Sequence, residues 1–329
     1  MGCVRVVVVA GGIGGARFLR GVRAAIPDAE VTALVNTGDD LTVHGMRVCP
    51  DLDTVMYTLG DGIDRARGWG RDGESWRVKD ELAAYGADPA WFGLGDLDLA
   101  THLIRTRMLD AGYPLSAVTE ALCARWRPGV RLLPMSDDRV ETHVLVDAEP
   151  GPADAPRTGG GRRAIHFQEW WVRHRATLPA YGFVQVGLEA AKPAAGVLDA
   201  LATADAILLA PSNPVVSIGT VLAVPGIRDA VRAAPGQVVG LSPIVAGAPV
   251  RGMADACLTA IGVATTAEAV GRRYGSRAWA DGVLDGWLVD TADAAARVPG
   301  VRVEAVPLLM TDEAATTAMA RAALTLAGV

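Results

Sequence analysis

The fold is decided by the stretch Val6-Val7-Val8-Val9-Ala10-Gly11-Gly12-Ile13-Gly14-Gly15-Ala16-Arg17, near the start of the chain. Four consecutive β-branched residues are typical of a short, fully buried strand, because a half-exposed strand alternates apolar and polar positions. The glycines end this strand and let the backbone approach a ligand closely. An apolar helical pattern follows, so the turn ends at a helix N-terminus, whose free N–H groups attract anions. The stretch therefore predicts a binding site, the phosphate seat, for the phosphates of a nucleotide-activated substrate.

A second buried-strand pattern over residues 31–35 completes a βαβ unit, for which a right-handed crossover to a parallel neighbour is expected. Further strands are predicted over 206–210, 237–241 and 301–306, with helices between them. Several of these strands end in polar, Gly or Pro turns. Such an α/β pattern predicts functional loops at the carboxyl edge of one mostly parallel sheet.

The 329 residues are predicted to form one large α/β unit. Two β-rich pieces, 142–146 and 164–171, are expected to pair as a hairpin across a Gly-, Pro- and Arg-rich loop at 149–163. The predicted parts are a core from 1–60 and 190–261, a helical insertion over 61–130, a β-rich segment over 131–189 and a C-terminal α/β segment over 262–329.

Composition excludes several classes of protein. A net charge of −6 argues against a general binder of nucleic acid or anionic membranes, which needs a concentrated positive field. There is no signal-peptide pattern at the start and no apolar run of membrane-spanning length, which indicates a cytoplasmic protein. The four cysteines form no CxxC pair, so the sequence predicts neither a zinc site nor a disulfide framework.

Two common phosphate motifs do not fit the glycine turn. A dinucleotide fingerprint requires a third glycine where Arg17 stands, and an acidic residue where the second strand ends at Asn36. A P-loop requires Gly-Lys-Ser/Thr, which is missing here. Arg17 is a candidate for a bidentate phosphate contact, although a solvated helix arginine is the alternative.

Four aspartates, Asp39, Asp40, Asp51 and Asp53, lie at the ends of adjacent elements near the predicted phosphate seat. Mg²⁺ usually binds through one or two carboxylates together with substrate phosphates. We expect Asp39 and Asp53 to be the metal ligands, while helix capping is the alternative role. Asp39 and His44, which stands beside this cluster, are the candidates for proton transfer. None of the five histidines has a Cys or His partner at metal-binding spacing.

The turn at Ser212 and Asn213 stands between two prolines directly after an apolar strand. Its side chains and N–H groups are expected at the carboxyl edge of the sheet, where they suit phosphate or ribose contacts. A plain strand exit is the alternative explanation.

Several motifs in a fixed order resemble the 2-phospho-L-lactate transferase family of coenzyme F420 biosynthesis, in its actinobacterial form. The resemblance spans nearly the whole chain. Besides the opening glycine stretch, the matching segments are 36–40 (NTGDD), 50–54 (PDLDT), 91–100 (WFGLGDLDLA), 133–138 (LPMSDD), 167–170 (FQEW), 210–214 (APSNP) and 242–244 (SPI).

This resemblance implies a Rossmann-like three-layer fold, a Mg²⁺ cofactor and a homodimer. It implies transfer of a phosphoenolpyruvyl or 2-phospho-L-lactyl group from a guanosine-diphosphate-activated donor to the deazaflavin alcohol FO, with release of GMP. The donor site is expected at the glycine turn with Arg17, Asn36, Ser212 and Asn213. The planar FO is expected against Asp96, Arg139 and Phe167.

The competing function is that of a related family with a similar glycine-rich start, whose members bind nucleotide sugars without known turnover. Such a protein should lack the segments 91–100 and 167–171, which are present here.

Overall fold

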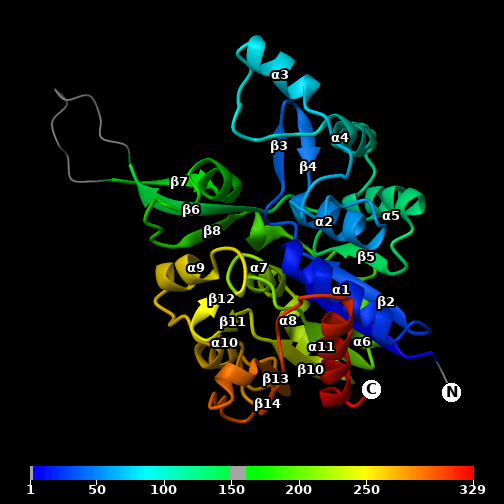
Figure 1. Cartoon of the computed structure of the whole chain (residues 1–329), viewed down its shortest axis with the longest axis vertical. Coiled ribbons are helices and arrows are strands. Elements are labelled where there is room, and N and C mark those ends of the chain that lie inside the picture. Colours follow the sequence, from blue (N-terminus) through cyan, green and yellow to red (C-terminus); the bar gives the residue numbers. More distant parts are fainter. Residues whose placement is uncertain (1–2, 149–160) are drawn as a thin grey trace.

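A seven-stranded sheet with the order β14-β13-β10-β9-β1-β2-β5 forms the centre of the structure, a computed structural model that describes residues 3–148 and 161–329 (Figure 1). Most of the predicted loop at 149–163 thus lies outside the described residues. All neighbouring strands in this sheet run parallel, which confirms the α/β prediction. The strands are β1 (Arg5–Ala10), β2 (Glu30–Val35), β5 (Arg131–Pro134), β9 (Ala206–Leu209), β10 (Gln237–Leu241), β13 (Gly286–Val289) and β14 (Arg302–Ala305).

Helices cover both faces of the sheet, and the alternation of side chains along β1 shows why both faces are apolar. Val6 and Val8 pack into the cluster formed with α1 (Gly12–Ala25), α2 (Pro50–Leu59), α5 (Leu115–Trp126) and α11 (Glu313–Leu326). Val7 and Val9 pack into the opposite cluster, with α6 (Val197–Ala202), α7 (Ile218–Ala223), α8 (Ile227–Ala233), α9 (Ala254–Ala260) and α10 (Ala267–Tyr274). Because strand side chains alternate between faces, a run of valines serves both layers.

Three strands of the sheet, β5, β13 and β14, come from outside the segments predicted to form the core. The predicted domain boundaries stay a prediction. β5 lies beside β2, and β14 corresponds to the strand expected over 301–306. β13 was not expected, because four residues beginning at Gly286 give too short an apolar pattern. Trp287 in β13 is fully buried between helices and sheet, which anchors this strand.

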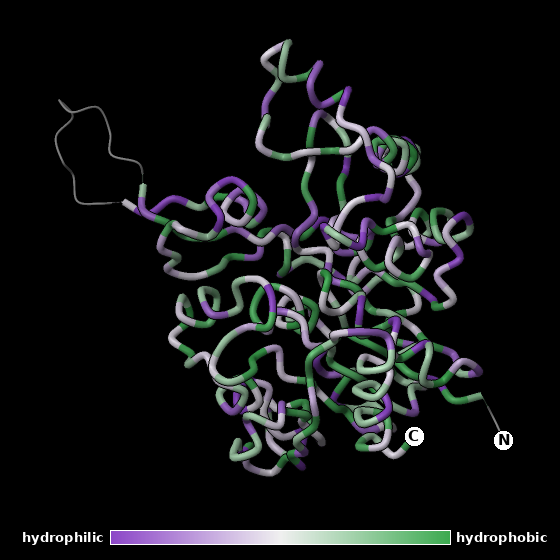
Figure 2. The backbone as a smooth tube through the Cα atoms, viewed as in Figure 1, coloured by the Kyte–Doolittle hydropathy of each residue, from purple (hydrophilic) through white to green (hydrophobic). Residues whose placement is uncertain are grey.

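An insertion rises above the carboxyl edge of the sheet (Figure 1). It contains the antiparallel ribbon of β3 (Leu41–Val43) and β4 (Met46–Val48), followed by α3 (Arg77–Ala84) and α4 (Asp96–Asp110). Figure 2 shows hydrophilic residues recurring along α3, whereas hydrophobic residues predominate in the central strands. None of the residues of α3 is buried, so this helix is held mainly through its ends and its contacts with α4.

A small antiparallel sheet with the order β7-β6-β8 lies beside the core. β6 (Glu141–Asp147) pairs with β7 (Arg162–His166), which confirms the predicted hairpin, and with β8 (Phe183–Val186). The strand predicted to continue to residue 171 is wrong beyond His166, because a π-helical turn, Glu169–Arg173, follows. This turn buries Trp170 and leaves Trp171 partly exposed.

The remaining elements are short. They are β11 (Ile244–Val245), β12 (Ala248–Pro249) and the 3₁₀ turns Leu188–Ala190 and Thr291–Asp293. Within the described ranges, the helices are too short or too polar to cross a lipid bilayer.

Candidate functional site

The central strands β1 and β9 mark the point where the strand order reverses. From β1 the chain proceeds to β2 and β5 on one side, and from β9 it proceeds to β10, β13 and β14 on the other. The loops that leave two such strands diverge, and ligands of open α/β sheets bind in the crevice between them. Here Ser212 Oγ donates a hydrogen bond to the Gly11 carbonyl at 2.7 Å and accepts one from the Gly11 N–H at 3.2 Å. The glycine turn and the Ser-Asn turn therefore form one rigid corner.

A cavity of about 810 Å³ lies at this corner. It is large enough for a nucleotide and part of a second substrate, since ordinary ligand sites measure about 300–1,000 Å³. Residues predicted from sequence that line it are Gly11, Gly12, Gly14, Arg17, Asp39, Asp53, Phe167, Ser212 and Asn213.

The glycine turn presents a helix N-terminus to the cavity. Gly12 has a positive φ of +61°, a conformation that side-chain-bearing residues rarely adopt. Gly11 at the N-cap provides no side chain to satisfy the first N–H groups of α1. Gly15 is buried behind the turn, where a Cβ would lie 2.7 Å from Ser212 Oγ. Its absence of a side chain lets the helix approach the Ser-Asn turn, so Gly15 supports the site without lining it.

Asp39 and Asp51 are buried carboxylates at the wall of this cavity. Burial, and then the charge of Asp51, raises the pKa of Asp39 well above its ordinary value. Burial likewise raises the pKa of Asp51 to about 6, although hydrogen bonds from Asn36 and the Gly12 backbone oppose the shift. Asp39 Oδ1 has no hydrogen-bond partner among the described residues. Two desolvated acids with a free oxygen suit a bound cation, which would relieve their repulsion.

Asp53 has a different environment from the one expected. Both of its oxygens accept hydrogen bonds from the guanidinium of Arg105 in α4. Arg105 Nη1 lies 3.1 Å from Oδ2, and Nη2 pairs with Oδ1. Both side chains are buried, and only the edge of Asp53 reaches the cavity wall. The structure therefore assigns Asp53 to a buried salt bridge that fastens α4 to α2. Asp51, which the sequence reasoning left out of the metal pair, faces Asp39 instead.

A polar stripe on α4 extends this contact. Tyr57 donates to Asp98 Oδ1 at 2.6 Å, and His102 Nδ1 lies 3.1 Å from Arg105 Nη1. Arginine can only donate, so we assign His102 the tautomer that carries its proton on Nε2, which faces Asp98 Oδ2 at 3.6 Å. The i, i+4, i+7 spacing of Asp98, His102 and Arg105 is a sequence signal that could have revealed this stripe.

Two residues expected to contact the donor also have positioning roles. Asn36 is fully buried and does not line the cavity; it donates to Asp51 at 3.0 Å and accepts from the Gly38 N–H. Asn213 lines the cavity while its Oδ1 accepts from the N–H groups of Val215 and Val216. These bonds hold the acid and the turn in place.

Three candidate residues lie away from the cavity. His44 occupies the turn between β3 and β4, where the ribbon carries it to a separate pocket of about 20 Å³ against α3. The carboxylate of Asp96 accepts from Ser75 Oγ and from two backbone N–H groups at the start of α3, so it holds that helix. Arg139 is exposed and pairs with Glu141. The expected roles of these three residues in proton transfer and FO binding are not supported by their positions.

Two other residues of the wall, Trp69 and Arg251, were missed because no local pattern marks them. Trp69 comes from the loop before α3 and Arg251 from the loop before α9, while Trp171, at the end of the aromatic segment 167–171, comes from the π-helical turn. Residues from such distant loops reach one cavity only through the tertiary fold.

Comparisons with known proteins place the chain in one family. A family model described as 2-phospho-L-lactate transferase CofD matches residues 6–321. The chain is 64% identical to a protein of Nocardia farcinica named phosphoenolpyruvate transferase, covering 99% of this chain and 95% of that protein. It is 64% identical to one from Streptomyces griseus, covering 98% of each, and 60% identical to one from Mycobacterium sp. strain JLS, covering 99% of each; both bear the same name.

Among solved structures, protein BH3568 from Bacillus halodurans is similar with a TM-score of 0.62 and 17% sequence identity. The match covers 98% of this chain and 100% of that one. At this identity the similarity concerns the fold alone.

Proposed function

Because this chain belongs to the CofD family of 2-phospho-L-lactate transferases, we propose that it transfers a phosphoenolpyruvyl group to the deazaflavin FO. The donor is enolpyruvyl-diphospho-5'-guanosine, and the products are dehydro-F420-0 and GMP. The corresponding lactyl donor, which would give F420-0, is the alternative substrate of the same site. The observation that carries the proposal is the identity of 60% to 64% to phosphoenolpyruvate transferases over almost the whole chain.

The reaction requires attack by the ribityl hydroxyl of FO on the β-phosphorus of the donor. A new P–O bond forms to FO, the bond from the β-phosphorus to the bridging oxygen of GMP breaks, and the hydroxyl proton leaves. Catalysis then depends mainly on alignment and on neutralising the phosphate charge.

The donor diphosphate fits the corner at the end of β1. The N-terminus of α1 supplies the N–H groups of Ile13 and Gly14, while the Gly12 N–H is bonded to Asp51, and Ser212 closes the opposite wall. This combination of helix end and glycine backbone is a general anion site. A diphosphate placed here also lies near Asp39 and Asp51.

A Mg²⁺ cofactor fits the acid pair better than it fits Asp53. Asp39 has an oxygen with no hydrogen-bond partner among the described residues, whereas both oxygens of Asp53 already accept hydrogen bonds from Arg105. No group of three or more metal-binding side chains occurs in the part of the chain that the structure describes, so substrate oxygens would complete the coordination. When bound, Mg²⁺ would neutralise the diphosphate and polarise the reacting phosphorus. Asp39 is also the candidate acceptor of the hydroxyl proton.

The aromatic wall suits the planar ring system of FO. Phe167 and Trp171 line the cavity from the side of the small sheet, and Trp69 and Phe92 line it from the insertion. Aromatic faces bind flat conjugated rings by stacking and apolar contact. The family resemblance further implies a homodimer, which light scattering of the purified protein tests.

The decisive experiment incubates the protein with FO, Mg²⁺ and each guanosine-diphosphate donor, followed by mass spectrometry. We expect a product of the mass of dehydro-F420-0 or F420-0, equimolar GMP, and loss of both when EDTA is added. Binding of the donor without product from either donor would contradict the proposal and favour a nucleotide-binding regulatory protein. Unchanged turnover in EDTA would contradict only the metal assignment.

A further inference from the structure

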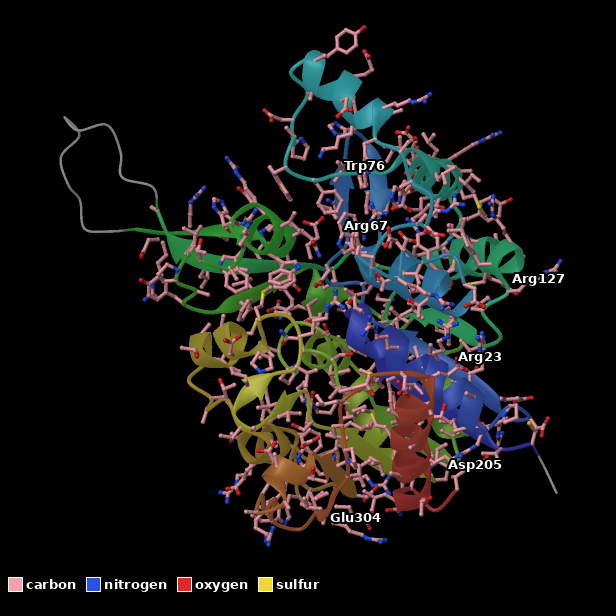
Figure 3. All side chains as sticks on the ribbon, in the orientation of Figure 1. Arg23, Arg67, Trp76, Arg127, Asp205 and Glu304 are labelled. Carbon is pink, nitrogen blue, oxygen red and sulfur yellow. The ribbon has the colours of Figure 1, made fainter. Side chains whose placement is uncertain are left out.

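Arg17 lies at the wall of the cavity without an acidic partner. It stands in the second turn of α1, and none of the hydrogen bonds or ion pairs found among the described residues involves its side chain. The other arginines of this helix are engaged. Arg20 pairs with Asp61 at 2.6 Å, and Arg23, labelled in Figure 3, donates to two backbone carbonyls. Arg17 therefore differs from its neighbours in having an unused guanidinium.

Arg251 reaches the same cavity from the opposite half of the chain. Its Nη2 donates to the Arg67 carbonyl at 3.0 Å and packs on Gly68, where a Cβ would lie only 3.1 Å away. A guanidinium has five N–H donors, so this contact positions the group and leaves others available to a ligand.

The loop that supports Arg251 is itself well held. Arg67 pairs with Asp64 at 2.9 Å, and its guanidinium lies 5.2 Å from the ring of Trp69 and 5.3 Å from that of Trp76. Figure 3 shows Arg67 and Trp76 together in the insertion. The Arg67 carbonyl, which holds Arg251 at the wall of the cavity, thus belongs to a well-packed loop.

The two arginines oppose each other electrostatically. Burial, and then the charge of Arg17, lowers the pKa of Arg251. Like charges held near each other without an acid between them are unfavourable, and an anion between them removes the repulsion. The geometry thus indicates a second anionic subsite next to the phosphate seat.

The distances along α1 place this subsite close to the transferred phosphate. Gly14 and Arg17 are three residues apart, about 4.5 Å along a helix axis, and helical side chains lean toward the N-terminus. The guanidinium of Arg17 therefore extends back toward the end of the helix that receives the diphosphate. Asp51 approaches the turn at the N-cap of α1, since a Cβ at Gly11 would lie 2.7 Å from Asp51 Oδ2, six residues before Arg17.

We propose that Arg17 and Arg251 bind the carboxylate of the three-carbon acid carried by the donor, and so distinguish an acid-bearing guanosine diphosphate from GDP. This inference rests on the proposed function. The carboxylate sits on the carbon next to the ester oxygen of the β-phosphate, so it must lie beside the phosphate and away from the aspartates. Arginine matches a planar carboxylate with two parallel hydrogen bonds.

The test measures donor binding without FO, so that no turnover occurs. Calorimetry gives Kd for GDP, for lactyl-diphospho-5'-guanosine, and for the isopropyl ester of GDP, which replaces the carboxylate by a methyl group. The proteins are wild type, Arg17→Gln, Arg251→Gln and the double variant. Arg20→Gln on the same helix and Arg272→Gln on α10 serve as controls, because both side chains pair with acids outside the cavity.

We expect each single variant to weaken binding of the lactyl donor by about tenfold or more, the usual effect of losing a hydrogen bond to a charged group. Binding of GDP and of the isopropyl ester should weaken much less than binding of the lactyl donor, because these ligands lack the carboxylate and feel the arginines only through the charge on the phosphates. Both arginines are exposed, so the melting temperatures should match that of wild type.

Parallel weakening of GDP and donor binding would overturn the inference, because it would make these arginines phosphate ligands. Unchanged donor binding in the double variant would overturn it as well. A wild-type protein that binds GDP no more weakly than the lactyl donor, and forms no product when FO and Mg²⁺ are then added, would instead contradict the proposed function.

Discussion

The buried ion pair between Asp53 and Arg105 gives the sharpest test of the site as the structure presents it. Asp53 is 5% exposed and Arg105 is 1% exposed, and both carboxylate oxygens face the guanidinium. Arg105→Met removes the cation but keeps an unbranched stem of similar length. His102 Nδ1 lies 3.8 Å from Asp53 Oδ2, but in the tautomer assigned above this nitrogen carries no proton, so it does not neutralise the carboxylate that remains. Removing one partner of a buried pair costs about 3–5 kcal/mol, because the other charge stays desolvated.

Urea denaturation measures this loss. With a slope of about 3 kcal/mol per molar urea, the midpoint should fall by about 1 M or more. Asp53→Asn should cost a similar amount, since Arg105 would then be buried without an anion. Combining both changes should cost clearly less than the sum, because no isolated charge remains. Arg107→Met, on the exposed side of α4, is the matched control and should leave the midpoint unchanged.

The reasoning is refuted if both single variants lose less than about 1 kcal/mol, the value typical of exposed pairs. An Asp53→Asn protein with normal stability but weakened Mg²⁺ binding would return Asp53 to the metal site. The same measurement on Asp39→Asn should show weakened Mg²⁺ binding without a loss of stability.

Three further predictions concern Asp51, Tyr57 and Asp96. Burial raises the pKa of Asp51 from 3.8 to about 6, so the folded chain binds a proton more readily than the unfolded one, and the metal-free protein should lose stability as the pH rises from about 4 through about 6. Melting curves in EDTA should show this slope reduced in Asp51→Asn, and equal slopes would contradict the assignment. Tyr57→Phe should cost about 1.5–3 kcal/mol in urea denaturation, because its hydroxyl donates to the Asp98 carboxylate; a loss below about 0.5 kcal/mol would count against that bond. Asp96→Ala should leave KM for FO unchanged while making α3 easier to cleave by protease, since its carboxylate holds the start of that helix; a raised KM with α3 intact would restore Asp96 to the FO site.

Much of the architecture could be predicted because its signals are local. The valine run of β1 and the hairpin of β6 and β7 depend on residue types that favour strands, and both were found as expected. Predictions failed where the pattern was short or interrupted. Four residues of β13 gave too little signal, and the aromatic segment after His166 turned into a π-helix that buries Trp170.

By itself the sequence determined the parallel α/β order, the helix N-terminus behind the glycine turn, and the gathering of acids and a Ser-Asn turn at one sheet edge. These features follow from strand and helix patterns and from where each strand ends. Only the tertiary structure decided which side chains each of these residues contacts. Arg105, 52 positions away, takes both oxygens of Asp53, which leaves Asp51 to face Asp39. The β3–β4 ribbon places His44 at a separate pocket, away from the acids. The hydrogen bond to the Arg67 carbonyl holds Arg251 at the same cavity that Arg17 lines. Spacing along a chain fixes which residues end an element, but partners are set by how distant elements pack.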